Sequence, residues 1–414
     1  MGRRAILRRD VLSSANQLAE AQGLRISRLK NIHPGAIILV IAYWMVVAIC
    51  VLALGAAAVA SVMAFMTIWN MAQAHGHDHA IHYGDAYLWG SASQAYIYSP
   101  QASFFGSDDD PWGYREVTLG GRYDLRDNVH MVMQGEYRTA GESDTVGMRM
   151  SQAYMDAWMP IGKSSIVGAR AGRIEPPFSF YNKTRDSIFS RPSVILPQSV
   201  YLESLGVRDT LISGDGMVLY GRHEMGDSAI EARAGAFVPP FIEDGSSFEG
   251  RIMESGWIDY SWTEKLRLRL TMMHAEDGDT VVTYPVFGAQ SILGKWTLTS
   301  EWGRLNLDTP AGRISTDGVY GQVEYLVTPN MALIARYDHL EIDIDSPLPI
   351  ALGDDALAAD GFMFGGSYDF NDHVRMNIEY HYSDGTVWLN RAENPGLTPG
   401  REWDALIMMM SVRF

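Results

Sequence analysis

The chain has 414 residues, of which 47% are hydrophobic, and its formal net charge is −16. This size and composition suit a large soluble domain, two smaller domains or a membrane barrel. The acidic balance argues against nucleic acid as a partner, because the phosphate backbone needs a basic surface. The remaining choice depends on how the apolar residues are distributed.

The first 74 residues differ from the rest. They hold seven basic residues but only Asp10 and Glu20, and the chain then turns apolar from Ala36 to Trp69. The small-x-small triplet Ala72-Gln73-Ala74 follows, as at signal-peptidase sites. Residues 1–74 are therefore predicted to be a removable export signal. Because the run is long enough to span a bilayer, two alternatives stay open: a start assigned too far upstream, or a hydrophobic segment retained as an inner-membrane anchor.

Residues 75–414 are predicted to form the mature protein. They hold 26 of the 33 basic and 47 of the 49 acidic residues, a net charge of −21, and no cysteine. Cys50 is not a convincing lipoprotein site, since Ile49 precedes it where a small residue is needed.

From about Ile81 the chain repeats one pattern: about ten residues of alternating character, a tight turn, ten more, and a longer loop. In 374–382, for example, the odd positions are charged or polar and the even ones apolar or aromatic. Such a strand has one face suited to lipid and one suited to water. The weakest strands are those at 81–98 and 280–292.

The turns and loops give the strand count. Tight turns are predicted at 126–128, 162–164, 226–228, 263–265, 328–330 and 371–373, with a less certain one near Gly294. Longer loops are predicted at 99–112, 139–147, 175–215, 240–250, 276–280, 305–317, 343–359 and 385–400. Seven turns and eight loops imply sixteen strands. An even count with short turns at one rim and long loops at the other is typical of an antiparallel transmembrane β-barrel.

A soluble β-sandwich also alternates polar and apolar residues. Sixteen hairpin strands without a helix would leave a sandwich with exposed edges, whereas a closed barrel has none. The pattern therefore favours an all-β membrane protein.

The last strand ends in Phe414 and places five apolar residues on one face: Leu406, Met408, Met410, Val412 and Phe414. This resembles the C-terminal insertion signal of outer-membrane barrels, which the barrel-assembly machinery binds. Aromatic residues such as Tyr114, Tyr123, Trp262, Trp296, Tyr368 and Trp403 fall near strand ends and are predicted to form interface girdles.

The third long loop is unlike a solvated loop. It contains Glu175-Pro176-Pro177-Phe178, further aromatic residues and several cations. We expect it to fold into the lumen and narrow it. Its charged residues are the predicted pore constriction: Lys183, Arg185, Asp186, Arg191 and Glu203.

In this loop the chain resembles the sixteen-stranded porins of Gram-negative bacteria, in which the third loop forms the constriction. The resemblance covers the mature chain in layout, and in motif only this loop and the last strand. The stretch from Gly172 to Phe178 also looks like the passage into the third loop of phosphate-selective porins. Since no dense lysine ladder is present, phosphate selectivity does not carry over.

By alternation, charges of both signs are predicted to face the lumen, where they would form a transverse field. The alternative is that most of them only pair across strands. The predicted set is Arg122, Arg138, Arg233, Arg267, Arg269, Arg336, Arg375, Glu116, Glu136, Glu231, Asp259, Glu301, Glu324, Asp338 and Glu379. The loop core from Lys183 to Arg191 has three basic residues and one acidic residue, which favours anions because local charge at the narrowest point dominates.

His75, His77, His79 and His82 form a histidine-rich start that could hold Zn²⁺ or Cu²⁺, although a flexible unbound tail is the simpler interpretation. No cofactor is expected. The sequence contains no Gly-x-Ser-x-Gly, His-Glu-x-x-His or phosphate-loop motif, so no catalytic residues are assigned.

The sequence therefore predicts a porin in the bacterial outer membrane, a homotrimer as similar porins are, that passes small hydrophilic solutes or ions by diffusion. Two alternatives stay open. One is an adhesion or binding barrel with a blocked lumen, and the other is a barrel hydrolase.

Overall fold

The computed structural model describes residues 80–141, 147–185, 187–203, 207–239, 250–263, 265–345, 357–396 and 402–414. The predicted export signal, His75, His77, His79 and Asp186 lie outside the described residues. Within the described residues, no helix is long and apolar enough to cross a membrane.

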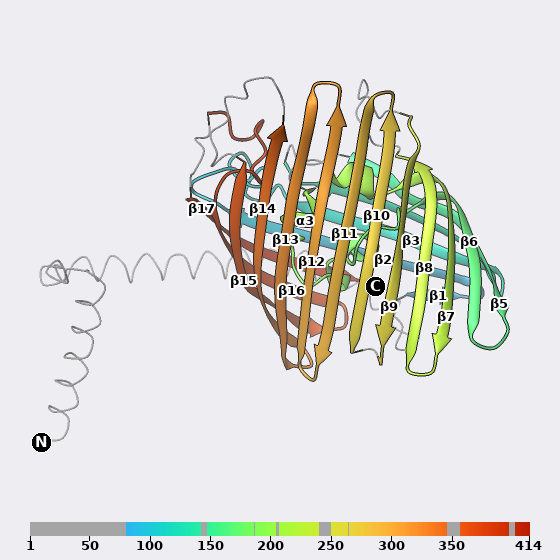
Figure 1. Ribbon diagram of the computed structural model, residues 1–414. Helices are drawn as coiled ribbons and strands as arrows, with labels where there is room; N and C mark the ends of the chain where they lie inside the picture. Colours follow the sequence, from blue (N-terminus) through green and yellow to red (C-terminus); the bar gives the residue numbers. More distant parts are fainter. Residues whose placement is uncertain are drawn as a thin grey trace, which may run out of the picture. The chain divides into compact units, whose positions relative to one another are not determined.

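Sixteen strands form a closed antiparallel barrel, as predicted. Each strand from β2 onward pairs with the next one in chain order, and the last, β17, pairs with β2. Figure 1 shows the strands side by side around the wall. They are β2 (Ala86–Tyr98), β3 (Arg115–Arg126), β4 (Val129–Thr139), β5 (Gly147–Ile161), β6 (Ser165–Ile174), β7 (Gly214–Met225), β8 (Ser228–Val238), β9 (Met253–Trp262), β10 (Leu266–Asp277), β11 (Thr280–Leu293), β12 (Trp296–Thr309), β13 (Gly312–Thr328), β14 (Met331–Asp345), β15 (Ala358–Asn371), β16 (Val374–Asp384) and β17 (Glu402–Arg413).

Short elements complete the fold. Strand β1 (Ile81–Tyr83) folds back on β2 through a tight turn. In its described residues the third loop carries two 3-10 turns and two single-turn helices: η2 (Asn182–Thr184), η3 (Ile188–Ser190), α3 (Gln198–Tyr201) and α4 (Arg208–Leu211). Helix α3 packs against β12, β13 and β14, and in Figure 1 it is seen behind these strands.

All seven predicted short turns are present, including the one at Gly294. Two predicted long loops are wrong. The segments 276–280 and 305–317 belong mostly to long strands, and each contains only a two-residue turn. In the first, Asp277 pairs with Thr280, and in the second, Thr309 pairs with Gly312. The polar residues that suggested a loop, such as Asp308 and Arg313, form an ion pair across these strand ends at 2.5 Å. These charged residues lie opposite each other in the hairpin, so they mark the strand ends and not a break in the sheet.

The wall is apolar outside and polar inside. On β10, Leu270 is 57% exposed, whereas its strand neighbours Arg269 and Thr271 are 4% and 1% exposed. Large apolar side chains lie exposed on strands all around the barrel: Leu119, Met133, Met155, Leu219, Ile258, Phe287, Leu298, Leu333, Phe364 and Ile378. This inverts the pattern of a soluble protein and fits a barrel whose outer solvent is lipid.

Aromatic residues near the strand ends divide into two groups. Tyr123, Trp262, Trp296 and Tyr368 are exposed, as expected for interface girdles. Tyr114 and Trp403 are instead buried: the Tyr114 hydroxyl donates to Glu116 at 2.9 Å, and the Trp403 indole donates to the Gly385 carbonyl at 3.0 Å. Girdle placement was therefore wrong for these two, because polar partners inside the barrel bind their polar atoms.

The C-terminal residue closes the barrel against β2. Gly90 and Phe414 exchange two backbone hydrogen bonds, of 3.2 and 3.0 Å. A Cβ atom on Gly90 would lie 2.5 Å from the Phe414 ring. A glycine at position 90 therefore makes room for the terminal ring at the closing seam.

Candidate functional site

The third loop, between the end of β6 and the start of β7, folds into the barrel and binds the wall. Its strongest anchor is Glu301 on β12, which is 1% exposed. The Glu301 carboxylate accepts hydrogen bonds from the Tyr201 hydroxyl at 2.8 Å, the Phe180 amide at 3.1 Å and the Ser179 hydroxyl. Tyr320 on β13 donates a further bond, of 2.7 Å. One wall carboxylate thus holds both ends of the segment 179–201.

Other wall residues bind the loop along its length. Arg336 donates to the Ser193 hydroxyl and to the Ile195 carbonyl, both at 3.0 Å. Further contacts join Asp338 to Ser199, Arg269 to the Ser179 carbonyl, Arg375 to the Ile188 carbonyl, Glu379 to the Val194 amide and Tyr284 to the Val200 carbonyl. The loop is therefore attached to β10–β14 and to β16 on that side of the lumen.

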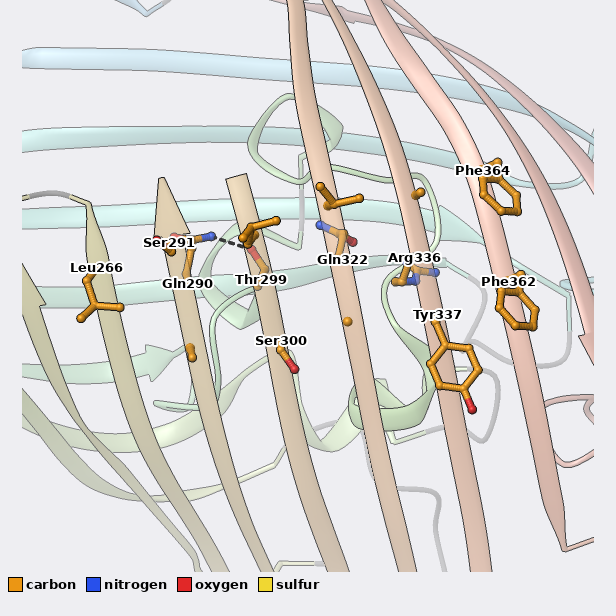
Figure 2. Close-up of a pocket in the computed structure, with 15 residues that line it drawn as sticks. Leu266, Gln290, Ser291, Thr299, Ser300, Gln322, Arg336, Tyr337, Phe362 and Phe364 are labelled. Carbon is orange, nitrogen blue, oxygen red and sulfur yellow. Dashed lines mark hydrogen bonds between the residues drawn. The ribbon is translucent and has the colours of Figure 1, made fainter. Parts of the chain in front are cut away.

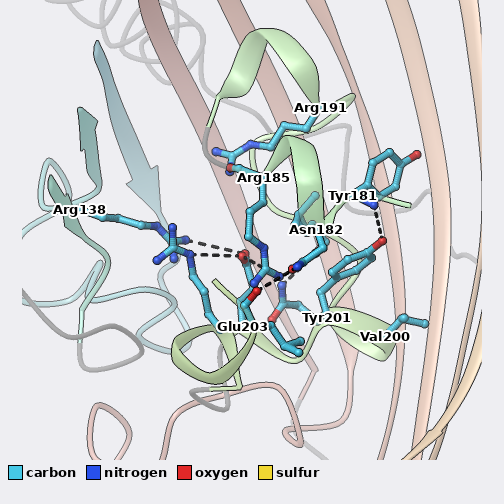
Figure 3. Close-up of polar contacts among 12 residues, drawn as sticks. Arg138, Tyr181, Asn182, Arg185, Arg191, Val200, Tyr201 and Glu203 are labelled. Atoms are coloured by element: carbon cyan, nitrogen blue, oxygen red, sulfur yellow. Dashed lines mark hydrogen bonds and ion pairs between the residues drawn. The ribbon is translucent and has the colours of Figure 1, made fainter. Parts of the chain in front are cut away.

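On the opposite side, the loop joins a buried group of charges (Figure 3). Arg191 donates to Glu116 on β3 at 2.6 Å. Glu203 lies 3.7 Å from each of three arginines, Arg138, Arg185 and Arg208. Arg185, Arg191 and Glu203 are 1–3% exposed.

This group carries excess positive charge. Its five arginines are Arg138, Arg149, Arg185, Arg191 and Arg208, and its three glutamates are Glu116, Glu136 and Glu203. All three nitrogens of the Arg185 guanidinium lack a hydrogen-bond partner in the described part of the chain. The Tyr201 ring lies 5.7 Å from this guanidinium. In this group the arginines therefore outnumber the carboxylates that can pair with them.

The residues predicted as a constriction thus fall into two environments. Arg185, Arg191 and Glu203 lie in the buried group, whereas Lys183 is exposed. Asp186 lies outside the described residues.

The residues predicted to face the lumen are found in three settings. Several bind the third loop or lie in the buried group: Arg138, Arg269, Arg336, Arg375, Glu116, Glu136, Glu301, Asp338 and Glu379. Two lie elsewhere: Arg122 pairs with Asp124 at 2.7 Å, and Glu324 accepts from Gln322 at 3.0 Å. The third setting is a cavity lined by Arg233, Arg267 and Glu231, and Asp259 pairs with Arg267 beside it.

The cavity has a volume of about 310 Å³ and lies between the first part of the third loop and the wall β6–β10. The loop contributes residues 175–180 and Lys183, and the wall contributes Arg170, Val218, Trp257 and the charged residues of β8 and β10. Five cations line it, Arg170, Lys183, Arg233, Arg267 and Arg269, against two carboxylates, Glu175 and Glu231.

The wall arginines alternate with aromatic rings. The Arg233 guanidinium lies 5.7 Å from the Tyr220 ring and 5.1 Å from the Trp257 ring. The Arg170 guanidinium lies 5.5 Å from the same Tyr220 ring. The Arg269 guanidinium lies 4.0 Å from the Trp257 ring, and that of Arg267 lies 5.1 Å from the Phe180 ring of the loop. Such cation–π contacts hold the planar guanidinium groups in fixed orientations.

Glu175 and Lys183 are the two titratable loop residues in the cavity. Burial raises the pKa of Glu175 to about 7, although the cations Lys183, Arg170, Arg185 and Arg233 oppose this rise. The cavity therefore contains a carboxyl group that changes charge near neutral pH.

A second depression, of about 570 Å³, lies on the outer face over β10–β15 (Figure 2). Its lining includes small residues such as Ala289, Gly321 and Ala335, between Leu298 and Phe364. These side chains belong to the apolar outer face, so this groove is separate from the lumen.

No metal centre is found among the described residues, where no group of three His, Cys, Asp or Glu side chains could hold an ion. Of the four histidines considered, only His82 is described. It lies exposed on β1 with its ring 4.3 Å from the Tyr87 ring.

Comparisons with known proteins identify the fold. No protein-family model matches the chain, and no curated protein matches its sequence. Among solved structures, OmpF of Salmonella typhi has a TM-score of 0.55 and 10% identity, covering 80% of this chain and 99% of that one. An anion-selective porin from Comamonas acidovorans has a TM-score of 0.53 and 14% identity, with coverages of 80% and 99%. OmpT of Vibrio cholerae, an outer-membrane protein, has a TM-score of 0.53 and 12% identity, with coverages of 81% and 100%.

These likenesses define the class of protein. The chain has the sixteen-stranded porin fold, and the apolar outer face agrees with that fold. A closed antiparallel barrel with an apolar outer face is the fold predicted from the sequence.

Proposed function

We propose that the protein is a passive diffusion channel for small hydrophilic solutes or ions, with a preference for anions. The observation that carries this proposal is the cavity beside β6–β10, where five cations face two carboxylates. Including Asp156 and Asp259, which pair with Arg170 and Arg267, the cations still outnumber the carboxylates by one. Protonation of Glu175 raises this excess to two.

We place the selective part of the passage in this cavity. Arg185, Arg191 and Glu203 are buried and paired, so a passing ion is separated from them by protein. Lys183 and Arg267 are the more accessible charges, with Arg267 having a side-chain exposure of 38%. Field lines focus where the passage is narrow and its walls have a low dielectric constant, so these charges set the ion preference.

The test is the reversal potential of the purified mature chain in planar bilayers under a KCl gradient. The wild type should give discrete conductance steps with chloride preferred. Arg267→Gln should move the preference toward potassium, whereas Arg122→Gln, which removes an arginine of 39% exposure on β3, should change it little. Conductance that prefers cations in the wild type, or an equal shift in both variants, would refute the anion preference.

The two alternatives predict different results. An adhesion barrel with a blocked lumen would give no conductance steps. A hydrolase would need a serine, a histidine and an acid together. The Ser165 hydroxyl lies 2.8 Å from His223 Nδ1 near the short-turn rim, but no carboxylate among the described residues contacts the other ring nitrogen. The cavity therefore supports a channel better than it supports an enzyme.

We further propose that residues 1–74 are removed on export and that the barrel is a homotrimer in outer-membrane lipid, inserted by the barrel-assembly machinery. The apolar outer face and the terminal strand ending in Phe414 support insertion. Intact mass of the purified protein tests the cleavage after Ala74, and sedimentation in detergent tests the trimer. A mass that includes the first 74 residues, or a monomeric barrel, would contradict these assignments.

A further inference from the structure

The cavity arginines have hydrogen-bonding capacity that the protein does not use. A guanidinium carries five N–H donors. The structure gives Arg267 one hydrogen bond, from Nε to Asp259 at 2.6 Å, and gives Arg170 one, from Nε to Asp156 at 2.8 Å. In each case the terminal N–H groups have no acceptor among the described residues, while Arg269 is saturated more fully by Asp259 and the Ser179 carbonyl.

These donors are also held in place before any solute arrives. Asp259 fixes one edge of the Arg267 guanidinium, and the Phe180 ring lies 5.1 Å from the guanidinium carbon. Arg170 is fixed in the same way by Asp156 and by Tyr154, whose ring lies 5.2 Å away. A preorganised planar fork with free terminal N–H groups matches the two oxygens of a carboxylate.

Beside its charged residues, the cavity has an apolar part. Pro176, Pro177 and Phe178 of the loop and Val218 and Trp257 of the wall contribute to it. The volume of about 310 Å³ is at the lower end of the range for small-molecule sites. A small inorganic anion would leave these surfaces without a partner, whereas a solute with an apolar body would cover them.

From these observations, and resting on the proposed function, we infer that the cavity is a binding site for organic carboxylates with a planar apolar body. The carboxylate lies against Arg267 and its neighbours on the wall, and the apolar body lies against the proline-rich start of the third loop. The channel thereby holds such solutes briefly during passage, instead of only conducting small ions.

The test uses benzoate as the probe, added to the mature chain conducting KCl in planar bilayers. Benzoate should interrupt the chloride current at a concentration about tenfold lower than acetate does, because the ring adds buried apolar area. Benzamide, which has the ring but no charge, should not interrupt it. Arg267→Gln should raise the half-blocking concentration of benzoate about tenfold, as expected for a lost charge-assisted hydrogen bond, while Arg122→Gln should leave it unchanged.

The outcomes separate this inference from the proposed function. Three results would overturn the inference and leave the proposed channel intact. They are conductance that benzoate does not interrupt, block by acetate or benzamide equal to that by benzoate, and a half-blocking concentration of benzoate that Arg267→Gln does not change. Absence of any conductance would instead refute the proposed diffusion channel. Calorimetric titration of benzoate into the folded barrel in detergent tests the binding site independently of conduction. A heat of binding whose affinity Arg267→Gln lowers about tenfold supports the site, and no heat in the wild type overturns it.

Discussion

The hydroxyl of Tyr201 donates a 2.8 Å hydrogen bond to the carboxylate of Glu301, a contact between the far part of the third loop and strand β12. The same carboxylate accepts from the Phe180 amide near the start of the loop. Because one acceptor serves both, the position of the loop depends strongly on a single wall residue.

Replacing this acceptor should release the loop without opening the barrel. In Glu301→Leu the Tyr201, Tyr320 and Phe180 donors lose a buried acceptor, at a cost of about 1–3 kcal/mol each. We expect faster proteolysis within 179–201 and a larger, noisier open-channel current, with the folded barrel retained on a heat-modifiable gel. Glu341→Leu, at an exposed site on β14, is the control. A proteolysis rate equal to that of the control would contradict the anchoring role.

The buried charge group predicts unequal effects of its members. Glu203 faces three arginines, so Glu203→Gln should destabilise the folded barrel by about 3–5 kcal/mol, the cost of leaving buried charges uncompensated. Arg185→Met should cost about 1 kcal/mol or less, because the group has more arginines than glutamates and the Arg185 guanidinium has no hydrogen bond in the described structure. The temperature at which the folded gel mobility is lost measures both. Equal losses for the two variants would show that the excess of arginines is unimportant.

Ion preference should depend on pH through Glu175. Its pKa is raised to about 7 by burial, so the carboxyl is neutral below this pH and negative above it. Lowering the pH from about 8.5 to 5.5 should therefore increase the preference for chloride, because the cavity cations Arg170, Lys183, Arg233 and Arg267 then face one carboxylate fewer. Glu175→Gln should show the low-pH preference throughout. A pH dependence that persists in this variant would assign the effect to another group.

The closing seam can be tested through its glycine. A side chain on Gly90 meets the Phe414 ring, whereas one on Gly321 of β13 meets nothing within 4 Å. Gly90→Val should lower barrel stability by about 1–3 kcal/mol, as overpacking does, and reduce the yield of folded barrel. Gly321→Val should have little effect. Similar yields for the two variants would contradict the seam assignment.

The sequence predicted the wall better than the lumen. Strand alternation has a period of two, so the inward and outward faces followed directly from residue order. The strand ends at 305–317 were misassigned because Pro310, Gly312 and the charged residues beside them, Asp308 and Arg313, are typical of a loop. The burial of Arg185 and Arg191 could not be predicted, since it depends on how the third loop itself folds.

The row of arginines and aromatic rings on β7–β10 could be predicted from the sequence. A tight turn fixes the register of a hairpin, and the predicted turns at 226–228 and 263–265 place Arg233 beside Tyr220 and Arg269 beside Asp259. The long third loop fixes no such register between β6 and β7. The alternation of arginines and aromatic rings could therefore be predicted on β7–β10, but its continuation to Arg170 needed the structure.

The most direct test of the account is cysteine accessibility during conduction, which residues 75–414 permit because they contain no cysteine. A negatively charged thiol reagent should react rapidly with Lys183→Cys and reduce the open-channel current, because this position lines the passage beside β6–β10. It should not react with Ser193→Cys, which is buried against Arg336. Block of the current through Ser193→Cys with no effect on Lys183→Cys would place the passage on the other side of the third loop and contradict the account.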